Sequence, residues 1–306
     1  MLITPISILL PKSLDEGVVP DDWKIANVCP IFKKGVKSQV SNYRPVSLTS
    51  QVSKVIESVL RDAIVSHLKY NELIRDSQHG FRKGRSCLTN LLVFLDKVTG
   101  YIDEGYVDVI YLDFAKAFDK VPHQRLLDKL KRHGIHGKVF NWIEAWLTNR
   151  RQRVCIQGKF STWAAVTSGV PQGSVLGPVL FLIFINDLDK DVGSCVLKFA
   201  DDTKIFREIS NVRDSATLQR DLELLQKWSQ VWQMEFNVDK CKVMHIWKHN
   251  TEVKYTMANT QLKTVHEEDL GVLITEDLKS SAHCIHSYTK ANRMLGLIKR
   301  TLTTQQ

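Results

Sequence analysis

A pair of adjacent aspartates between two apolar runs, at residues 198–206, limits the fold more than any other part of this sequence. The residues on both sides of Asp201 and Asp202 favour β-strands, so we expect the pair at or beside a tight hairpin turn. Neighbouring carboxylates repel each other and gain nothing from burial. A divalent cation with oxygen ligands, such as Mg²⁺, would reverse that balance. The alternative is two solvated aspartates in a surface turn.

A second acidic stretch, residues 109–119, reads as an apolar strand that ends in Asp113 and is followed by a turn with two aromatic residues and Asp119. Ionised aspartate is rarely buried unless it is paired or bound to metal. Asp113 set against Asp201 and Asp202 would form a site for two ions about 3.5–4 Å apart. The alternative for Asp113 is a cap at the end of the strand for the following helix.

A third stretch, residues 168–178, carries three glycines and two prolines and is followed by an apolar run at 179–185. This composition demands special backbone angles and permits close approach to a ligand.

Together the three stretches, YLDFAKAFD, SGVPQGSVLGPVLFLIFINDL and FADD, resemble in sequence and order the palm motifs of reverse transcriptases from LINE-type (non-LTR, jockey-like) retrotransposons. Residues 42–48, 78–86 and 270–274 also resemble blocks of this family. The resemblance covers about residues 17–296 and suggests a fragment of a longer polyprotein.

The resemblance implies an α+β fold with the fingers and palm of a right-hand polymerase, an antiparallel palm sheet packed on helices, and an incomplete thumb. The implied division is a partial N-terminal helix or linker at 1–22, fingers at 23–108, a palm with interleaved fingers elements at 109–275, and the truncated start of a thumb at 276–306. The reverse transcriptase domain would span about 23–275.

Periodicity and turn signals predict several elements directly. An amphipathic helix is expected at 51–68, with Val52, Val55, Ile56, Val59, Leu60 and Ile64 on its apolar face. A long helix is expected at 214–232, with Asp214 or Ser215 as its N-cap. A strand at 236–246, with Lys240 in the preceding turn, and a last helix at 281–302 complete these expectations.

For catalysis, the resemblance implies that Asp113 and Asp201 hold two Mg²⁺ ions, with Mn²⁺ as a substitute, and that the Phe114 carbonyl supplies a third oxygen. Asp202 matches the second acid of the family's pair and is expected to coordinate less directly. Lys240 matches a lysine near the leaving pyrophosphate. Asp119 is expected to be a helix cap or a salt-bridge partner.

For the incoming nucleotide, Phe118 lies where the family has a bulky side chain under the sugar. There it would exclude a 2′-hydroxyl; the alternative is a plain core aromatic. Gln172 and Gly173 resemble the residues that cradle the nucleotide. The basic pair that grips the triphosphate is expected to be Arg44 with Lys33 or Lys34, and the sequence does not decide between the lysines.

Charge indicates a polyanionic partner, because the net charge is +9 and the pI is near 9.2. Residues 120–159 carry ten Lys or Arg against two acids, and Arg150 and Arg151 within them are candidate contacts to a nucleic-acid backbone. A second candidate is the basic loop that contains an aromatic residue, with Phe81, Arg82, Lys83 and Arg85. The alternative in each case is a solvated surface segment.

The function expected is that of an RNA-directed DNA polymerase that adds dNTPs to a DNA primer on an RNA template. The alternative is a catalytically silent remnant that at most binds nucleic acid. Scattered cysteines predict neither a disulfide framework nor a CxxC zinc site. A poor N-terminal leader and apolar runs too short for a membrane span predict an intracellular protein of nucleus or cytoplasm that is not secreted. No required protein partner is evident.

Overall fold

The computed structural model describes residues 3–102, 105–247, 250–265 and 267–303. They form two compact units, each built from three separate segments of the chain. The first unit comprises Met1–Phe81, Phe114–Lys190 and Lys227–Glu235. The second comprises Arg82–Asp113, Asp191–Gln226 and Phe236–Gln306. This mixture of helices and largely antiparallel sheet confirms the predicted α+β class.

The first unit is mainly helical. Its sheet has the strand order β2-β1-β4-β5, with β6 paired to β4. The pairing is antiparallel except for β1 with β4, which run parallel. Its elements are α1 (Ile3–Glu16), α2 (Asp21–Lys24), β1 (Ile25–Phe32), η1 (Val40–Asn42), β2 (Tyr43–Leu48), α3 (Gln51–Tyr70), α5 (Ala117–Lys120), α6 (His123–Arg132), α7 (Gly137–Leu147), β4 (Arg151–Ile156), β5 (Lys159–Phe160), β6 (Ala164–Ala165) and α8 (Gly177–Ile185).

Helix α8 lies in the core of the first unit. It is apolar all round, and every residue from Val179 to Ile185 is buried, as expected for a helix that is covered on every side. Its N-terminus is held by Glu57 of α3, a fully buried acid. The Glu57 Oε2 atom accepts hydrogen bonds from the Val175 and Leu176 amides at 2.7 and 3.3 Å. A carboxylate here satisfies amides that the helix leaves unpaired.

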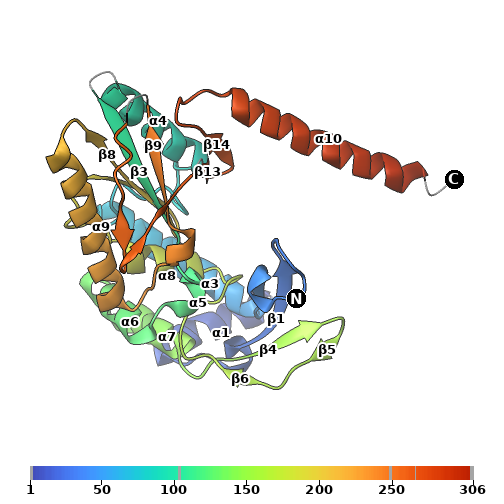
Figure 1. Ribbon diagram of the computed structural model, residues 1–306. Helices are drawn as coiled ribbons and strands as arrows, with labels where there is room; N and C mark the ends of the chain where they lie inside the picture. Colours follow the sequence, from blue (N-terminus) through green and yellow to red (C-terminus); the bar gives the residue numbers. More distant parts are fainter. Residues whose placement is uncertain (1–2, 103–104, 248–249, 266, 304–306) are drawn as a thin grey trace. The chain divides into compact units, whose positions relative to one another are not determined.

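The second unit is built on an antiparallel sheet with a helix against one face. The strand order is β12-β9-β3-β8-β7, in which only β12 and β9 run parallel. Figure 1 shows α4 beside this sheet, and their apolar side chains form one core. The elements are α4 (Cys87–Ile102), β3 (Tyr106–Leu112), β7 (Cys195–Phe199), β8 (Asp202–Ile209), η2 (Val238–Lys240), β9 (Lys242–Ile246), β10 (Thr256–Met257), β11 (Thr260–Gln261), β12 (Lys263–Thr264), β13 (Glu267–Asp269), β14 (Val272–Ile274) and α10 (Ser281–Thr303).

Helix α9 (Val212–Trp232) contributes its first part to the second unit and its last part to the first. Its predicted N-cap is wrong by three or four residues. The helix begins at Val212, and Asn211 accepts a hydrogen bond from the Arg213 amide at 2.8 Å. Asp214 instead reaches back and accepts from the Ser210 and Asn211 amides at 3.2 Å each. This reciprocal arrangement is a capping box, so the true cap lies before the acid that the sequence suggested.

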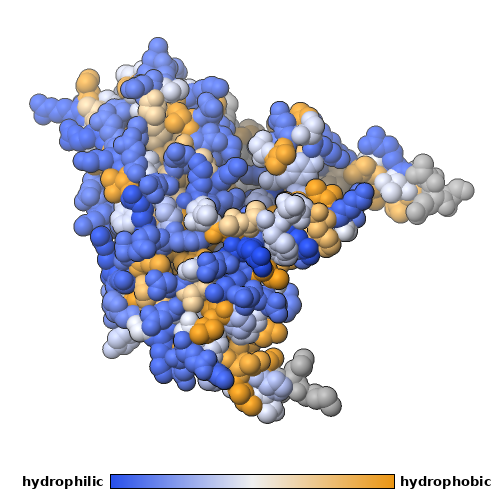
Figure 2. Space-filling view, turned by 90° about the horizontal axis from the view of Figure 1, so that it is seen from below, coloured by the Kyte–Doolittle hydropathy of each residue, from blue (hydrophilic) through white to orange (hydrophobic). Residues whose placement is uncertain are grey.

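The predicted apolar face of α3 is half right. Ile56, Leu60 and Ile64 are buried, but Val52, Val55 and Val59 are exposed. The buried face includes the polar residues Ser53 and Glu57, whose hydrogen bond to each other measures 2.8 Å. None of the helices in the described ranges is long and apolar enough to span a bilayer. On the face seen in Figure 2, hydrophilic side chains dominate and apolar ones form small groups.

Candidate functional site

Two of the predicted acids lie at the ends of paired strands in the second unit. Strand β3 pairs with β8 up to Leu112 opposite Thr203, so the next pair in this register would be Asp113 opposite Asp202. Strands β7 and β8 form the predicted hairpin, with Phe199 paired to Asp202. Only Ala200 and Asp201 connect them, and Ala200 adopts φ +56°. A positive φ is unusual for alanine and reflects the demand of so short a connection.

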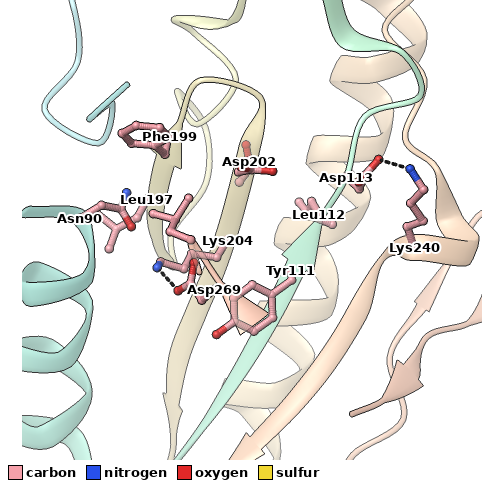
Figure 3. Close-up of a pocket in the computed structure, with 12 residues that line it drawn as sticks. Asn90, Tyr111, Leu112, Asp113, Leu197, Phe199, Asp202, Lys204, Lys240 and Asp269 are labelled. Atoms are coloured by element: carbon pink, nitrogen blue, oxygen red, sulfur yellow. Dashed lines mark hydrogen bonds and ion pairs between the residues drawn. The ribbon is translucent and has the colours of Figure 1, made fainter. Parts of the chain in front are cut away.

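Asp113 and Asp202 line one cavity of about 120 Å³, together with Lys240. Figure 3 shows Asp113 at the end of β3 with Lys240 opposite it, and Asp202 on the neighbouring hairpin. The Lys240 Nζ atom lies 3.4 Å from Asp113 Oδ1, and both side chains are partly exposed. Because the pair is solvated, it adds little stability. The cavity therefore brings Asp113 and Asp202 together with the ammonium group of Lys240.

The main chain at Asp113 is held by the turn that carries Lys240. The Asn237 amide donates to the Asp113 carbonyl at 2.7 Å. The thiol of Cys241 also bonds to the backbone of Asp113, and burial raises the pKa of this thiol to about 11. Sequence reasoning missed Asn237 and Cys241. Their only signal is their position on either side of Lys240 in the 236–246 segment.

A buried ion pair forms another wall of this cavity. Lys204, two residues after Asp202 on β8, pairs with Asp269 of β13, and both are almost fully buried. The Lys204 Nζ atom also lies 4.4 Å from the centre of the Phe94 ring. Burial lowers the pKa of Lys204 and raises that of Asp269, while their mutual attraction opposes both shifts. No sequence pattern pointed to this pair.

The other predicted metal ligands lie outside this cavity lining. Asp201 is half-buried in the hairpin connection, and Phe114 belongs to the first unit, where its buried ring lies 6.4 Å from that of Trp228. Within the described residues, no three His, Cys, Asp or Glu side chains gather closely enough to hold a metal ion. The donor chemistry at the strand ends nevertheless suits Mg²⁺, since aspartate oxygens are the hard ligands that this ion selects.

The first unit holds the residues predicted to lie under the sugar and to cradle the incoming nucleotide. The Phe118 ring stacks on Phe181 with centroids 4.4 Å apart, and the Phe81 ring meets it edge-on at 6.4 Å. Phe118 is half-buried, so it is both a packed aromatic and accessible. The Gln172 amide donates to Asp119 Oδ1 at 3.0 Å. Asp119 thus fixes the side chain of Gln172, and this role differs from the cap or salt bridge expected.

Both glycines of the SGVPQG stretch lie very close to the backbone of neighbouring segments. A Cβ atom on Gly173 would lie 2.6 Å from the Ser47 carbonyl oxygen, and one on Gly169 would lie 2.6 Å from the Asp119 carbonyl oxygen. Both glycines have positive φ, +117° and +87°. Their requirement for glycine is therefore already explained by packing against β2 and α5, without a ligand.

The basic residues predicted to bind the triphosphate lie on one hairpin. Lys33 and Lys34 directly follow β1, and Arg44 is on β2, paired with Ile31 of β1. All three side chains are exposed. The structure thus brings these cations to the same end of the β1–β2 hairpin.

The predicted nucleic-acid contacts differ in exposure. Phe81, Lys83 and Arg151 are exposed, whereas Arg82 and Arg85 are half-buried. Arg150 is only 2% exposed, so its guanidinium does not belong to the open surface on which the sequence placed it. Arg150 lies just before β4 and beyond the end of α7 at Leu147, and its guanidinium packs over the Trp146 ring.

The comparisons with known proteins agree with these motifs. A family described as "Reverse transcriptase (RNA-dependent DNA polymerase)" matches residues 31–263. The RNA-directed DNA polymerase from mobile element jockey of Drosophila melanogaster is 27% identical, over 96% of this chain and 34% of that protein. The probable RNA-directed DNA polymerase from transposon X-element of the same species is 29% identical, over 86% of this chain and 30% of that protein.

Among solved structures, apo telomerase from Candida tropicalis has a similar fold, with a TM-score of 0.57 at 12% identity. The match covers 90% of this chain and 59% of that chain. This chain spans about a third of the length of the curated relatives. The match over residues 31–263 and the relatives along nearly the whole chain confirm the resemblance drawn from the motifs: the chain belongs to the reverse transcriptase family.

Proposed function

We propose that this chain is an RNA-directed DNA polymerase core that adds dNTPs to the 3′-hydroxyl of a DNA primer on an RNA template. The observation that carries the proposal is the cavity of the second unit, where Asp113 and Asp202 lie at the ends of paired strands with Lys240 beside Asp113. Two neighbouring carboxylates at strand ends repel each other, and the charge of a divalent metal ion would offset that repulsion.

In this proposal Asp113 and Asp201 hold two Mg²⁺ ions, or Mn²⁺ in their place, with the Phe114 carbonyl as a further ligand and Asp202 in a lesser role. The ions would supply charge to activate the primer hydroxyl and to stabilise the triphosphate. Lys240 would present its ammonium group to the leaving pyrophosphate, where it donates a proton or offsets negative charge. The Asn237 amide keeps the strand end at Asp113 in position.

The remaining residues would select and hold the substrates. The Phe118 ring excludes the 2′-hydroxyl of a ribonucleotide. Gln172, fixed by Asp119, and Gly173 cradle the nucleotide, and Arg44 with Lys33 or Lys34 binds its triphosphate.

The basic loop at residues 81–85 and Arg151 would contact the nucleic-acid strands inside the cell. The division into fingers at 23–108, palm at 109–275 and the start of a thumb at 276–306 is part of the same proposal.

Primer extension tests the proposal. Purified chain with Mg²⁺ should extend oligo(dT) on poly(rA), and Asp113→Asn and Asp201→Asn should each abolish extension while circular dichroism stays unchanged. Asp191→Asn is a matched control, because Asp191 is an exposed acid of the same unit outside the cavity. Full-rate extension by either active-site variant would refute the metal ligands. Absence of extension by the wild-type chain, with hybrid binding retained, would favour the silent remnant.

A further inference from the structure

A second polar cavity, of about 280 Å³, lies in the first unit behind the loop at residues 168–172. Three cationic side chains, Lys116, Arg150 and Arg151, contribute to its lining, together with the backbone of β6 and the loop that follows it. None of these residues lines the cavity of the second unit. The polymerase proposal assigns Gln172 of this lining to the nucleotide and Arg151 to a nucleic-acid strand, but it gives Lys116 and Arg150 no ligand.

Arg150 is the unusual member of this lining. Its side chain is 2% exposed, and its Nη1 atom donates to the Trp146 carbonyl at 3.1 Å. The guanidinium lies 4.7 Å from the Trp146 ring centre. Its Nη2 atom is buried and has no hydrogen-bond partner among the described residues. A buried donor on a charged group is costly to leave unpaired, so the positive charge of this guanidinium is only partly compensated inside the protein.

Among the residues that the structure describes, no carboxylate bonds to this atom. Glu57 acts on Arg150 through space, but its own oxygens accept hydrogen bonds from Ser53 and from the amides that precede α8. Asp119 also lines the cavity, and its Oδ1 atom accepts from Gln172. Burial lowers the pKa of Arg150 to about 10, so the guanidinium remains a cation at neutral pH.

We propose that this cavity binds a phosphate group close to the Arg150 guanidinium, with Lys116 and Arg151 at the rim supplying further positive charge. Phosphate fits because its oxygens carry the negative charge that guanidinium and ammonium groups bind. The exposed rim cations would attract the anion, and the buried guanidinium would orient it. The group is either a phosphodiester of a nucleic-acid strand or free phosphate. Phosphate binding at this cavity depends neither on a metal ion nor on Asp113 in the cavity of the second unit.

The test measures binding by the full chain in EDTA, so that catalysis plays no part. Inorganic phosphate, compared with chloride at equal ionic strength, should raise the melting temperature in a saturable manner. Arg150→Gln should weaken phosphate binding about tenfold or more, since the charge of the guanidinium is lost. Because Arg150 is buried, that variant risks misfolding. The double variant Lys116→Gln/Arg151→Gln alters only exposed side chains and should also weaken binding.

Lys69→Gln is the matched control, because Lys69 is an exposed cation of the same unit that does not line the cavity. It should leave phosphate affinity unchanged. A labelled single-stranded RNA oligonucleotide separates the two sources. If phosphate displaces the RNA from the wild-type chain but not from the double variant, the site binds a phosphodiester of a nucleic-acid strand. If phosphate binds saturably without displacing the RNA, the site binds free phosphate. No saturable phosphate effect in the wild-type chain, or equal affinity in the double variant, would overturn the proposal.

Discussion

The replacement Asp269→Asn would remove one charge from the buried pair with Lys204, leaving a nearly isosteric amide. The Lys204 side chain is 4% exposed and that of Asp269 is 7% exposed, so solvent cannot take the place of the lost carboxylate. The remaining ammonium keeps the Phe94 ring, 4.4 Å from Nζ, and the attraction of the Asp202 carboxylate. The variant therefore tests how much the pair stabilises the wall of the Asp113 cavity.

Breaking a buried ion pair by removing one partner typically costs about 3–5 kcal/mol. The contact between Lys204 and the Phe94 ring exists before and after the change, so it cancels from the difference. We therefore expect Asp269→Asn to lower the free energy of unfolding by roughly 3–5 kcal/mol. The apolar double variant Lys204→Met/Asp269→Leu should recover most of the loss, because burial opposes the charged form of both partners.

Urea unfolding followed by circular dichroism measures these differences, with equal slopes required before midpoints are compared. Asp191→Asn, an exposed acid in the same unit, should leave the midpoint unchanged. A wild-type midpoint for Asp269→Asn would refute the claim that the pair is desolvated. A double variant as unstable as the single variant would show that the ionic geometry itself is required.

Three further outcomes follow from the structure. Phe118→Ala should raise the ratio of rNTP to dNTP incorporation and cost roughly 2–3 kcal/mol of stability, because the ring that stacks on Phe181 is lost. Asn211→Ala should cost about 1 kcal/mol in urea unfolding, because the helix loses its N-cap. Burial lowers the pKa of His123 and His133 in the folded chain, so the unfolded chain binds protons before the folded chain does as the pH falls. The contribution of these histidines to the free energy of unfolding is complete above their ordinary pKa of 6.5. It is lost as the pH falls through the lower folded-state pKa values. His123→Gln should flatten part of that loss in urea midpoints compared at about pH 8 and pH 5.

The carboxylate hairpin was predictable because its signals are local. Apolar residues on both sides of Asp201 and Asp202 specify strands, and a connection this short permits only a tight turn. Asp113 was predictable for the same reason, as an acid that ends an apolar strand. The sequence alone did not show which residue lies opposite Asp113. The register of β3 with β8 provides this, because Leu112 pairs with Thr203 and the next position would set Asp113 opposite Asp202.

Residues whose environment depends on distant segments were not predictable in this way. The 51–68 pattern includes valines on two sides of a helix, and only the folded chain reveals that Glu57 takes a buried position while Val59 is exposed. Arg150 reads locally as part of a basic surface stretch. Its burial depends on Trp146, whose ring and carbonyl it contacts. Arg150 lies beyond the end of α7 at Leu147, and Asn149 before it adopts φ +57°, so helical spacing gave no signal for this contact.

Three of the buried charges missed from the sequence lie next to the motifs that suggested function. Glu57 holds the amides that follow the SGVPQG stretch, Lys204 pairs with Asp269 beside Asp113, and Arg150 lines a cavity behind Gln172. Each is costly compared with an apolar residue of the same size. Departures from a simple apolar core concentrate where a chain binds or reacts. Their placement argues that the regions around these motifs are shaped for anionic and cationic ligands as well as for stability.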